Sequence, residues 1–418
     1  EDLTVIDTRA TPPELGRLQN SLPDVTVITG VSSHALKVRC EVLVLSPGVS
    51  REHPIVAAAR CNGSEIIGDI ELFARHAKAT VIAVTGSNGK STVVTMVEEI
   101  LCGANLNVLC GGNLGTPALD LLVEGQIDCF VLELSSFQLE STETLAPSVA
   151  CILNVSLDHM DRYEDFAAYI AAKKRIYKNA ECVVLNADDA VLGELDPACE
   201  TQFISLDKNS AAAYRVGSYN SGLWLVAGGE KLMPISDLGV RGEHNTMNAL
   251  AALAITDKMC VSRSVQKRVL ADFRGLPHRC QTVANRDGVE WIDDSKGTNV
   301  GATSAAIRGV FSDRTGVLIA GGRGKGADFG VLAADTRGRV HSVILIGEDA
   351  KKIAAMLDGH LNVHFALNME VAVALAATLA KSGEAVLLSP ACASFDMFEN
   401  FEARGRAFAD AVSRLSSV

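Results

Sequence analysis

The chain has 418 residues, a formal net charge of -12, 48% hydrophobic residues and a mean hydropathy of +0.21. This acidic balance argues against a nucleic-acid-binding protein, which normally carries a basic face. No apolar run approaches the roughly 18 residues of a membrane-spanning helix, so we expect no membrane insertion. The length predicts two or three domains, each with a core of its own.

Eleven cysteines are spread from Cys40 to Cys392 without a C-x-x-C pair. This pattern offers no zinc site and indicates reduced, mostly buried thiols. Because no signal-peptide pattern is present, we expect a cytoplasmic protein. The chain opens without a methionine, directly in a strand-like run at residues 3–6, so we expect an N-terminally incomplete first domain.

Short runs of Val, Ile and Leu alternate with helical stretches along almost the whole chain. Since these runs are apolar on both faces, they predict parallel strands covered by helices, the α/β architecture. Residues 201–240 interrupt this alternation of strands and helices, and they predict a small antiparallel segment. The Gly275-Leu276-Pro277 sequence predicts a hinge between domains. The runs lie at 42–45, 81–84, 130–134, 149–153, 182–185, 317–320, 343–346 and 385–388.

The most informative segment is Thr85-Gly86-Ser87-Asn88-Gly89-Lys90-Ser91-Thr92, between an apolar run and a helical stretch. A strand, a glycine turn and a helix form a phosphate cradle, because backbone N–H groups and the helix dipole attract anionic oxygens. We expect Lys90 to reach the terminal phosphates and the Ser91 hydroxyl to bind Mg²⁺. The segment therefore predicts a nucleoside triphosphate site, although only two residues separate its glycines, where the common P-loop has four.

Polar residues follow other predicted strands, at the edge of the sheet where α/β proteins bind ligands. Glu133 would either pair with a lysine or bind Mg²⁺ opposite the phosphate loop. His159 lies in the next loop and, taken alone, is typical of a solvated hydrogen-bonding residue. Lys173 and Lys174, taken alone, indicate a solvated basic helix face.

Three strand ends in the last third carry glycine, hydroxyl and cationic groups, at 293–298, 321–326 and 389–394. Such loops are either plain turns or binding loops. In an acidic protein, Lys296, Arg323 and Lys325 favour clamps for a carboxylate or a phosphate. Cys392 has no evident His–acid partner nearby, and we interpret it as a packed thiol.

Seven strings, in family order, resemble the Mur ligases, which are ATP-dependent amide ligases of peptidoglycan synthesis. The last two are most similar to the members that add D-glutamate, and the short glycine spacing is the family's own form. The resemblance covers essentially all 418 residues. The strings are T-G-S-N-G-K-S-T (85–92), L-E-L-S-S-F-Q-L-E (132–140), N-V-S-L-D-H-M-D-R-Y (154–163), G-E-H-N-T-M-N-A (242–249), G-L-P-H-R (275–279), D-D-S-K-G-T-N (293–299) and S-P-A-C-A-S-F-D (389–396).

This resemblance implies an α/β protein of three domains. A Rossmann-like domain at 1–68 would bind the UDP substrate, a central P-loop ATPase domain with a parallel sheet would span 69–275, and a Rossmann-like domain at 276–418 would bind D-glutamate. The family's opening strand and Gly-rich loop have no counterpart here. The implied reaction joins D-glutamate to UDP-N-acetylmuramoyl-L-alanine. The substrate carboxylate attacks the γ-phosphate of ATP, and the amine then displaces phosphate from the acyl phosphate.

The resemblance also implies roles for individual residues. The catalytic residues would be Lys90, Glu133, His159 and Lys173. Two Mg²⁺ ions are implied, one at Ser91 and Glu133 and one at His159 and a carbamylated Lys173. Besides the phosphate loop, ATP would contact Asn245, Asn248, Arg279, Asp294 and Lys296. The UDP substrate would contact Asp7, Thr8, Arg9, Ser46, Pro47, Gly48, Asn113 and Ser135, and D-glutamate would contact Thr298, Lys325, Ser394 and Phe401.

Several alternatives stay open. Sister Mur ligases and folylpolyglutamate synthase-like ligases would add a different amino acid. A dinucleotide-dependent oxidoreductase would need G-x-G-x-x-G, but Gly322, Gly324 and Gly326 have another spacing. A non-catalytic nucleotide-binding scaffold would need no second metal site. We expect UDP-N-acetylmuramoyl-L-alanine and D-glutamate as partners, no nucleic acid, and a monomer.

Overall fold

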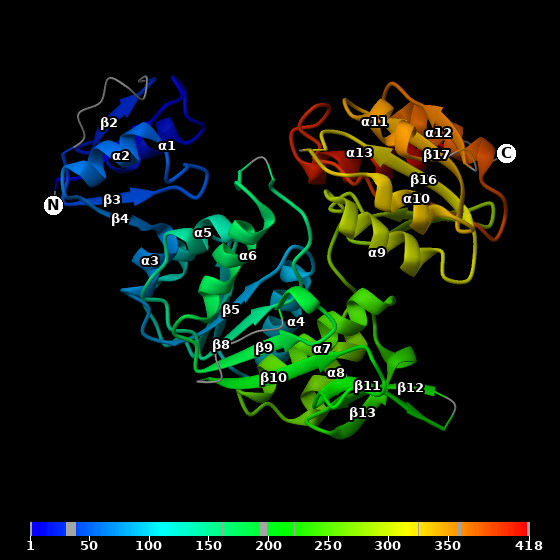
Figure 1. The fold of residues 1–418 in the computed structure, drawn as a ribbon, viewed down its shortest axis with the longest axis horizontal. Helices are drawn as coiled ribbons and strands as arrows, with labels where there is room; N and C mark the ends of the chain where they lie inside the picture. The colour runs from blue at the N-terminus through cyan, green and yellow to red at the C-terminus, as the bar shows by residue number, and fades with distance from the viewer. Residues whose placement is uncertain are drawn as a thin grey trace.

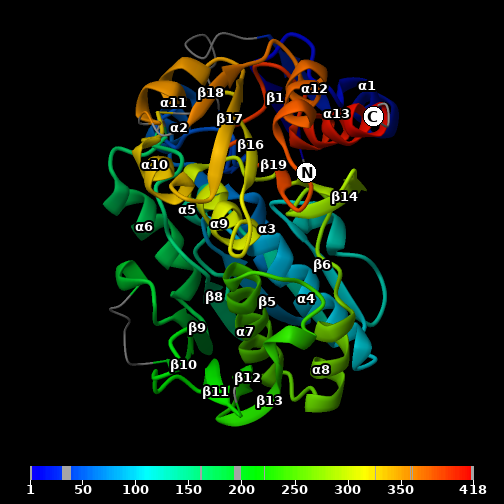
Figure 2. The same ribbon diagram turned by 90° about the vertical axis from the view of Figure 1, so that its right-hand side faces the viewer.

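The computed structural model describes residues 2–30, 39–160, 162–192, 199–220, 222–324, 326–357, 359 and 361–415. Three α/β units follow one another along the chain. Figure 1 shows that the first (blue) and the third (yellow to red) lie on the same side of the central one. The turned view in Figure 2 shows the same arrangement, so the central unit meets both of its neighbours at one end.

The N-terminal unit contains two separate parallel strand pairs. Strand β1 (Thr4–Asp7) pairs with β2 (Thr26–Thr29), and β3 (Val42–Leu45) pairs with β4 (Glu65–Gly68). Helix α1 (Leu15–Ser21) follows β1, and helix α2 (Pro54–Cys61) packs on β4. A small cluster of buried apolar residues, centred on Ile55 and Ala59 of α2, forms the core of this unit.

The central unit is built on a nine-stranded sheet in the order β13-β12-β11-β10-β9-β8-β5-β7-β6. Strands β5 to β11 pair in parallel, whereas β11, β12 and β13 pair antiparallel to one another. The strands are β5 (Thr80–Thr85), β6 (Val108–Gly112), β7 (Cys129–Glu133), β8 (Val149–Ile152), β9 (Cys182–Asn186), β10 (Glu200–Ser205), β11 (Tyr214–Tyr219), β12 (Gly222–Ala227) and β13 (Glu230–Pro234).

Helices cover both faces of this central sheet. One face packs on α4 (Lys90–Gly103), α7 (Glu243–Asp257) and α8 (Arg263–Asp272), and the other on α3 (Asp69–Ala74), α5 (Ser136–Glu140) and α6 (Phe166–Lys174). Within β5, Ile82 and Val84 face the first core while Val81 and Ala83 face the second. An apolar run on both faces is therefore what a strand between two helix layers requires. Short 3₁₀ helices span Ala118–Leu121, Arg175–Tyr177, Ala190–Leu192 and Ile235–Asp237.

The C-terminal unit is a six-stranded sheet in the order β14-β15-β19-β16-β17-β18. Only β14 runs antiparallel to its neighbour. The strands are β14 (Gln281–Arg286), β15 (Val289–Asp293), β16 (Gly316–Gly321), β17 (Val340–Ile346), β18 (Asn362–Phe365) and β19 (Ala385–Leu388). The helices are α9 (Val300–Val310), α10 (Gly330–Thr336), α11 (Ala350–Met356), α12 (Met369–Leu379) and α13 (Phe401–Ser413).

The α/β class and the parallel character of the sheets are confirmed. The predicted antiparallel segment is confirmed for β11, β12 and β13, but the prediction was wrong for β10, which pairs in parallel with β9. The prediction of mostly buried thiols was also wrong, because only four of the eleven cysteines are buried, namely Cys129, Cys151, Cys182 and Cys392. Within the described ranges, no helix is long and apolar enough to cross a membrane.

Candidate active site

The phosphate loop joins β5 to α4 with two glycines in conformations that other residues rarely adopt. Gly86 has φ of 155° and Gly89 has φ of 86°. A Cβ atom on Gly89 would lie 2.6 Å from Asn248 Oδ1, so both the backbone and the packing require glycine there. Lys90 curls back over the loop, and its Nζ donates to the carbonyl oxygens of Gly86 at 2.9 Å and Ser87 at 3.2 Å. The loop therefore has the shape of an anion cradle.

Glu133, at the end of β7, faces this loop and is buried. Its Oε2 accepts a hydrogen bond from Ser91 Oγ at 2.6 Å, and its Oε1 accepts one from Asn113 Nδ2 at 2.8 Å. Burial opposes ionisation of Glu133, but Lys90 and these two hydrogen bonds outweigh it and hold the pKa of the carboxyl below its usual range. The structure thus places an ionised carboxylate beside the Ser91 hydroxyl, and this oxygen pair fits a divalent cation bound with phosphate oxygens and water.

Four cations surround the loop: Lys90, Lys173, Arg279 and Lys296. Lys173 is buried, and the other three residues are partly buried. Burial lowers the pKa of all four, and for Lys296 it does so to about 8, with further lowering from Arg279 and Lys90. Positive charge gathered in this way favours a polyanionic ligand, because the ligand would offset the mutual repulsion of the cations.

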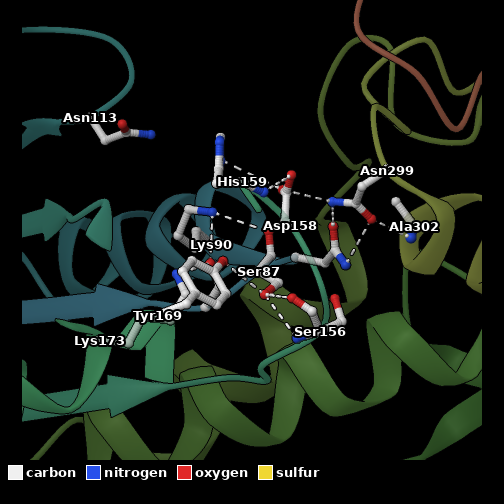
Figure 3. Close-up of polar contacts among 12 residues, drawn as sticks. Ser87, Lys90, Asn113, Ser156, Asp158, His159, Tyr169, Lys173, Asn299 and Ala302 are labelled. Carbon is white, nitrogen blue, oxygen red and sulfur yellow. Dashed lines mark hydrogen bonds and ion pairs between the residues drawn. The ribbon is translucent and has the colours of Figure 1, made fainter. Parts of the chain in front are cut away.

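Lys173 does not lie on a solvated helix face, so that interpretation was wrong. Its side chain is buried, Nζ donates to Gly86 O at 3.0 Å, and the ammonium lies 4.7 Å from the centre of the Tyr169 ring. Its neighbour Lys174 is only partly buried. The two adjacent lysines therefore differ in burial, and Lys173 lies at the phosphate loop (Figure 3).

His159 lies in the loop after β8 with φ of 58°. Its ring packs edge-on against Phe137 at 4.9 Å, and its Nε2 lies 3.7 Å from Asp158 Oδ2. Within the described ranges, no three His, Cys, Asp or Glu side chains are grouped closely enough to hold a metal. A lysine and a histidine as they stand are poor ligands for Mg²⁺, whereas a carbamate on Lys173 would supply the oxygen ligands that this ion prefers.

The other predicted nucleotide residues lie around the same loop. Asn248, on α7, packs against Gly89 and donates to Asn245 Oδ1 at 3.3 Å. Arg279 crosses from the C-terminal unit, and its Nη2 donates to Ser91 Oγ at 2.9 Å. Asp294 is buried behind Arg279, where it accepts a hydrogen bond from Ser389 Oγ at 2.6 Å. The hydrogen bond between Arg279 and Ser91 thus joins residues that are 188 positions apart in the sequence.

Asp294→Asn should stabilise the ligand-free protein at high pH. Burial raises the pKa of Asp294 from 3.8 to about 7, so between these values the folded state binds the proton more tightly than the unfolded state does. Stability from this group is therefore lost as pH rises, and the substitution removes that loss. We expect the thermal unfolding midpoint to gain several degrees at about pH 8 and little at about pH 4. An equal gain in the exposed control Asp287→Asn would contradict the assignment.

Three of the residues predicted to bind D-glutamate are described: Thr298 and Ser394 lie in loops of the C-terminal unit, and Phe401 begins α13. The Nζ of Lys296 lies 4.0 Å from the centre of the Phe401 ring, and Ser394 is buried. The N–H of Thr298 donates to Lys296 O at 2.7 Å, which makes a tight turn. Lys325 lies outside the described residues. Cys392 is buried in the apolar core, as its interpretation as a packed thiol predicts.

The predicted UDP-substrate residues are spread over two units. Asp7, the last residue of β1, forms a surface ion pair of 2.6 Å with Arg9, and Thr8 between them is exposed. Ser46 and Pro47 line a small pocket together with Phe137 and Gln138 of the central unit, and Gly48 follows them. Ser135 caps α5, and Asn113 points toward Glu133. The N-terminal and central units therefore share the lining of this pocket.

Several polar contacts escaped the sequence analysis. Arg404, fully buried on α13, donates to Ser295 O at 2.8 Å, to Ser295 Oγ at 3.0 Å and to Cys392 O at 3.1 Å, and so joins two of the predicted binding loops. His278 Nδ1 and Asp293 Oδ2 are 2.6 Å apart. An arginine within an amphipathic helix carries no local sign of burial, so no sequence signal could have found Arg404.

Comparisons with known proteins cover the whole chain. Residues 1–68 match a model of the MurD-like N-terminal domain of Mur ligases, 84–256 match the Mur ligase middle domain, and 278–392 match the Mur ligase glutamate ligase domain. The chain belongs to the Mur ligase family. A Mur ligase from Nitrosococcus oceani, named UDP-N-acetylmuramoylalanine–D-glutamate ligase, is 47% identical over 416 residues, which are 99% of this chain and 92% of that protein. A protein of the same name from Pseudomonas aeruginosa is 46% identical over 415 residues, again 99% and 92% of the two chains.

Solved Mur ligase structures share the fold at low identity. MurF from Acinetobacter baumannii aligns with a TM-score of 0.66 and 18% identity over 89% of this chain and 90% of that one. MurC from Thermotoga maritima aligns with a TM-score of 0.62 and 20% identity over 99% and 93% of the two chains. MurF from Thermotoga maritima, solved in complex with ADP, has a TM-score of 0.65 at 17% identity over 92% and 97%. These likenesses support the Mur ligase fold of all three units.

Proposed function

We propose that this Mur ligase joins D-glutamate to UDP-N-acetylmuramoyl-L-alanine and converts ATP to ADP and phosphate. The observation that carries the proposal is the identity of 46–47% along almost the entire chain with relatives named for this activity. The phosphate loop, the carboxylate facing it and the surrounding cations supply the chemistry that ATP-dependent activation of a carboxylate needs.

The first step brings two anions together, because the substrate carboxylate attacks the γ-phosphate of ATP. Lys90 and Arg279 enter the site from opposite units, and Lys296 flanks them, so their charges offset this repulsion. The carboxylate oxygen forms a bond to phosphorus while the bond to ADP breaks. Mg²⁺, held by Ser91 and Glu133 and at a second site by His159 and a carbamylated Lys173, would neutralise phosphate charge.

In the second step the D-glutamate amine attacks the acyl phosphate carbon. The carbon–oxygen bond to phosphate then breaks, phosphate leaves with one oxygen of the original carboxylate, and the amine loses a proton. Thr298, Ser394, Phe401 and Lys325 would hold D-glutamate for this attack. Asn113, hydrogen-bonded to Glu133, would orient the activated carboxyl group.

We further propose that each of three domains binds one of the three substrates. Residues 1–68 would bind the UDP moiety, through the segments at 7–9 and 46–48 and together with Ser135. Residues 69–275 would bind ATP, assisted by Asn245 and Asn248. Residues 276–418 would bring D-glutamate, with Arg279 and Asp294 completing the nucleotide site. We also propose that the protein is cytoplasmic and monomeric.

The test is phosphate release from ATP and Mg²⁺ with UDP-N-acetylmuramoyl-L-alanine, to which D-glutamate, L-glutamate, L-lysine or meso-diaminopimelate is added separately. We expect release with D-glutamate alone. Release with another amino acid would replace the proposal by a sister ligase activity. No release with any of them, in a chain that binds ATP, would favour a nucleotide-binding scaffold.

A further inference from the structure

We propose that Asn299 is a positioning residue that fixes the predicted amino-acid-binding loop against the phosphate loop. This inference rests on the function proposed above. Asn299 is the last residue of the D-D-S-K-G-T-N string, directly after Thr298, and the string itself indicates no role for it. The side chain is 7% exposed, and it lies where the C-terminal unit meets the central unit.

The orientation of the Asn299 amide is fixed by the helix that it caps. Its Oδ1 accepts a hydrogen bond from the N–H of Ala302 at 2.9 Å, as expected of an N-cap residue of α9. The Nδ2 group must therefore point the other way. It donates to Asn88 Oδ1 at 3.0 Å. It also donates to Asp158 Oδ2 at 3.3 Å, which is drawn as a dashed line in Figure 3. One side chain thus contacts two loops of the central unit.

Both acceptors are held firmly in the central unit. Asn88 lies between the two glycines of the phosphate loop, and Asn154 binds its backbone twice. The N–H of Asn88 donates to Asn154 Oδ1 at 2.9 Å, and Asn154 Nδ2 donates to Asn88 O at 3.1 Å. Asp158 directly precedes His159 and is mostly buried. A contact to these two residues therefore fixes Asn299 relative to the nucleotide site.

The first turn of α9 lies close to the phosphate loop. A Cβ atom on Gly301 would lie 3.2 Å from Ser156 Oγ, which is a tight contact, and 3.4 Å from Asn88 Nδ2, which is an ordinary one. The first turn of α9 therefore packs against the phosphate loop, and Asn299 lies at the N-terminal end of this turn. Hydrogen bonds in such an enclosed place, one of them to a carboxylate, are stronger than bonds at the surface.

The predicted amino-acid-binding loop, residues 294–298, is directly connected to Asn299, so its position depends on the contacts of Asn299. Gly297 N–H donates to Asp294 O at 2.8 Å and Thr298 N–H donates to Lys296 O at 2.7 Å, so residues 294–298 form a compact turn that ends at Asn299. A shift of Asn299 would move the adjacent Thr298, a predicted D-glutamate contact, with it. The phosphate loop, by contrast, keeps its own bonds to Asn154. Loss of the contact should therefore weaken the use of D-glutamate more than the binding of ATP.

Asn299→Asp is the sharpest test, because it keeps the cap oxygen for Ala302 and replaces the donor by an oxygen facing Asp158. The matched control is Asn368→Asp, since Asn368 caps α12 of the same unit through Val371 N–H at 2.9 Å and is exposed. We expect the KM for D-glutamate to rise at least about tenfold in Asn299→Asp, while the Kd for ATP with Mg²⁺ changes less than about twofold. The control should match the wild type.

A second readout needs no amino acid and so remains valid if the proposed function fails. The radius of gyration from small-angle X-ray scattering should increase in Asn299→Asp and stay unchanged in Asn368→Asp. An unchanged KM and radius would overturn the proposal. Equal losses in D-glutamate use and ATP affinity would also overturn it, because they would indicate a purely local role in the phosphate loop. If Asn299→Asp does not fold, Asn299→Ser, which keeps the cap and shortens the reach, decides by the same criteria.

Discussion

Lys90→Met should lower kcat for phosphate release about 10³-fold without destabilising the ligand-free protein. Lys90 Nζ lies over the loop and bonds to the carbonyls of Gly86 and Ser87, where the phosphates of ATP would sit. In the ligand-free protein the positive charge of Lys90 is repelled by the charges of Lys173, Arg279 and Lys296. Its removal therefore takes away charge stabilisation needed in the reaction while it relieves repulsion in the resting enzyme.

The measurement combines steady-state phosphate release with thermal unfolding. We expect the unfolding midpoint of Lys90→Met to stay within about 5 °C of the wild type, since two lost hydrogen bonds oppose the relieved repulsion. Lys78→Met is the matched control, because Lys78 is exposed just before the start of β5, at the opposite end of the strand from the loop. A kcat within about tenfold of the wild type would remove Lys90 from the catalytic residues.

Lys173→Ala should also lower kcat about 10³-fold, and short carboxylates such as acetate or formate should restore part of the activity. The buried amine lies beside Gly86 and under Tyr169. There it would add to CO₂ with loss of a proton, which gives a carbamate whose oxygens bind the second Mg²⁺. A small carboxylate entering the space left by the side chain would replace those oxygens.

Lys174→Ala separates this role from a general effect on the helix. Lys174 is the adjacent residue of α6 and is only partly buried, so its loss should leave kcat unchanged within about twofold. Unaffected turnover in Lys173→Ala would rule out the proposed second metal site. A defect without rescue by any short carboxylate would restrict Lys173 to a packing role.

Local patterns were sufficient to predict the fold class and the phosphate loop. The runs that predict β5, β7, β8 and β9 consist of consecutive residues, as in β5, where Ile82 and Val84 lie on one face and Val81 and Ala83 on the other. The two loop glycines are likewise demanded by backbone conformation, which a short string reveals. Only the resemblance to a family supplied the roles of Lys173, Asn113 and Phe401.

What the sequence could not predict depends on contacts between distant segments. Lys173 resembles Lys174 in sequence, and only the packing of α6 under the phosphate loop distinguishes them. Asn299 and Asn88 are 211 positions apart, and their contact exists because two folded units meet there. The burial of Arg404 between Ser295 and Cys392 has the same origin. Such contacts follow from how the units are placed, which local periodicity does not encode.

The central claim is that the substrate carboxylate is activated by direct transfer of the γ-phosphoryl group. The most direct measurement uses UDP-N-acetylmuramoyl-L-alanine with heavy oxygen in its terminal carboxylate, incubated with ATP, Mg²⁺ and D-glutamate, and mass spectrometry of the released phosphate. We expect one heavy oxygen atom in each phosphate released, because the acyl phosphate passes that atom from carbon to phosphorus. Phosphate without the label would mean that water attacks ATP, which would contradict the account.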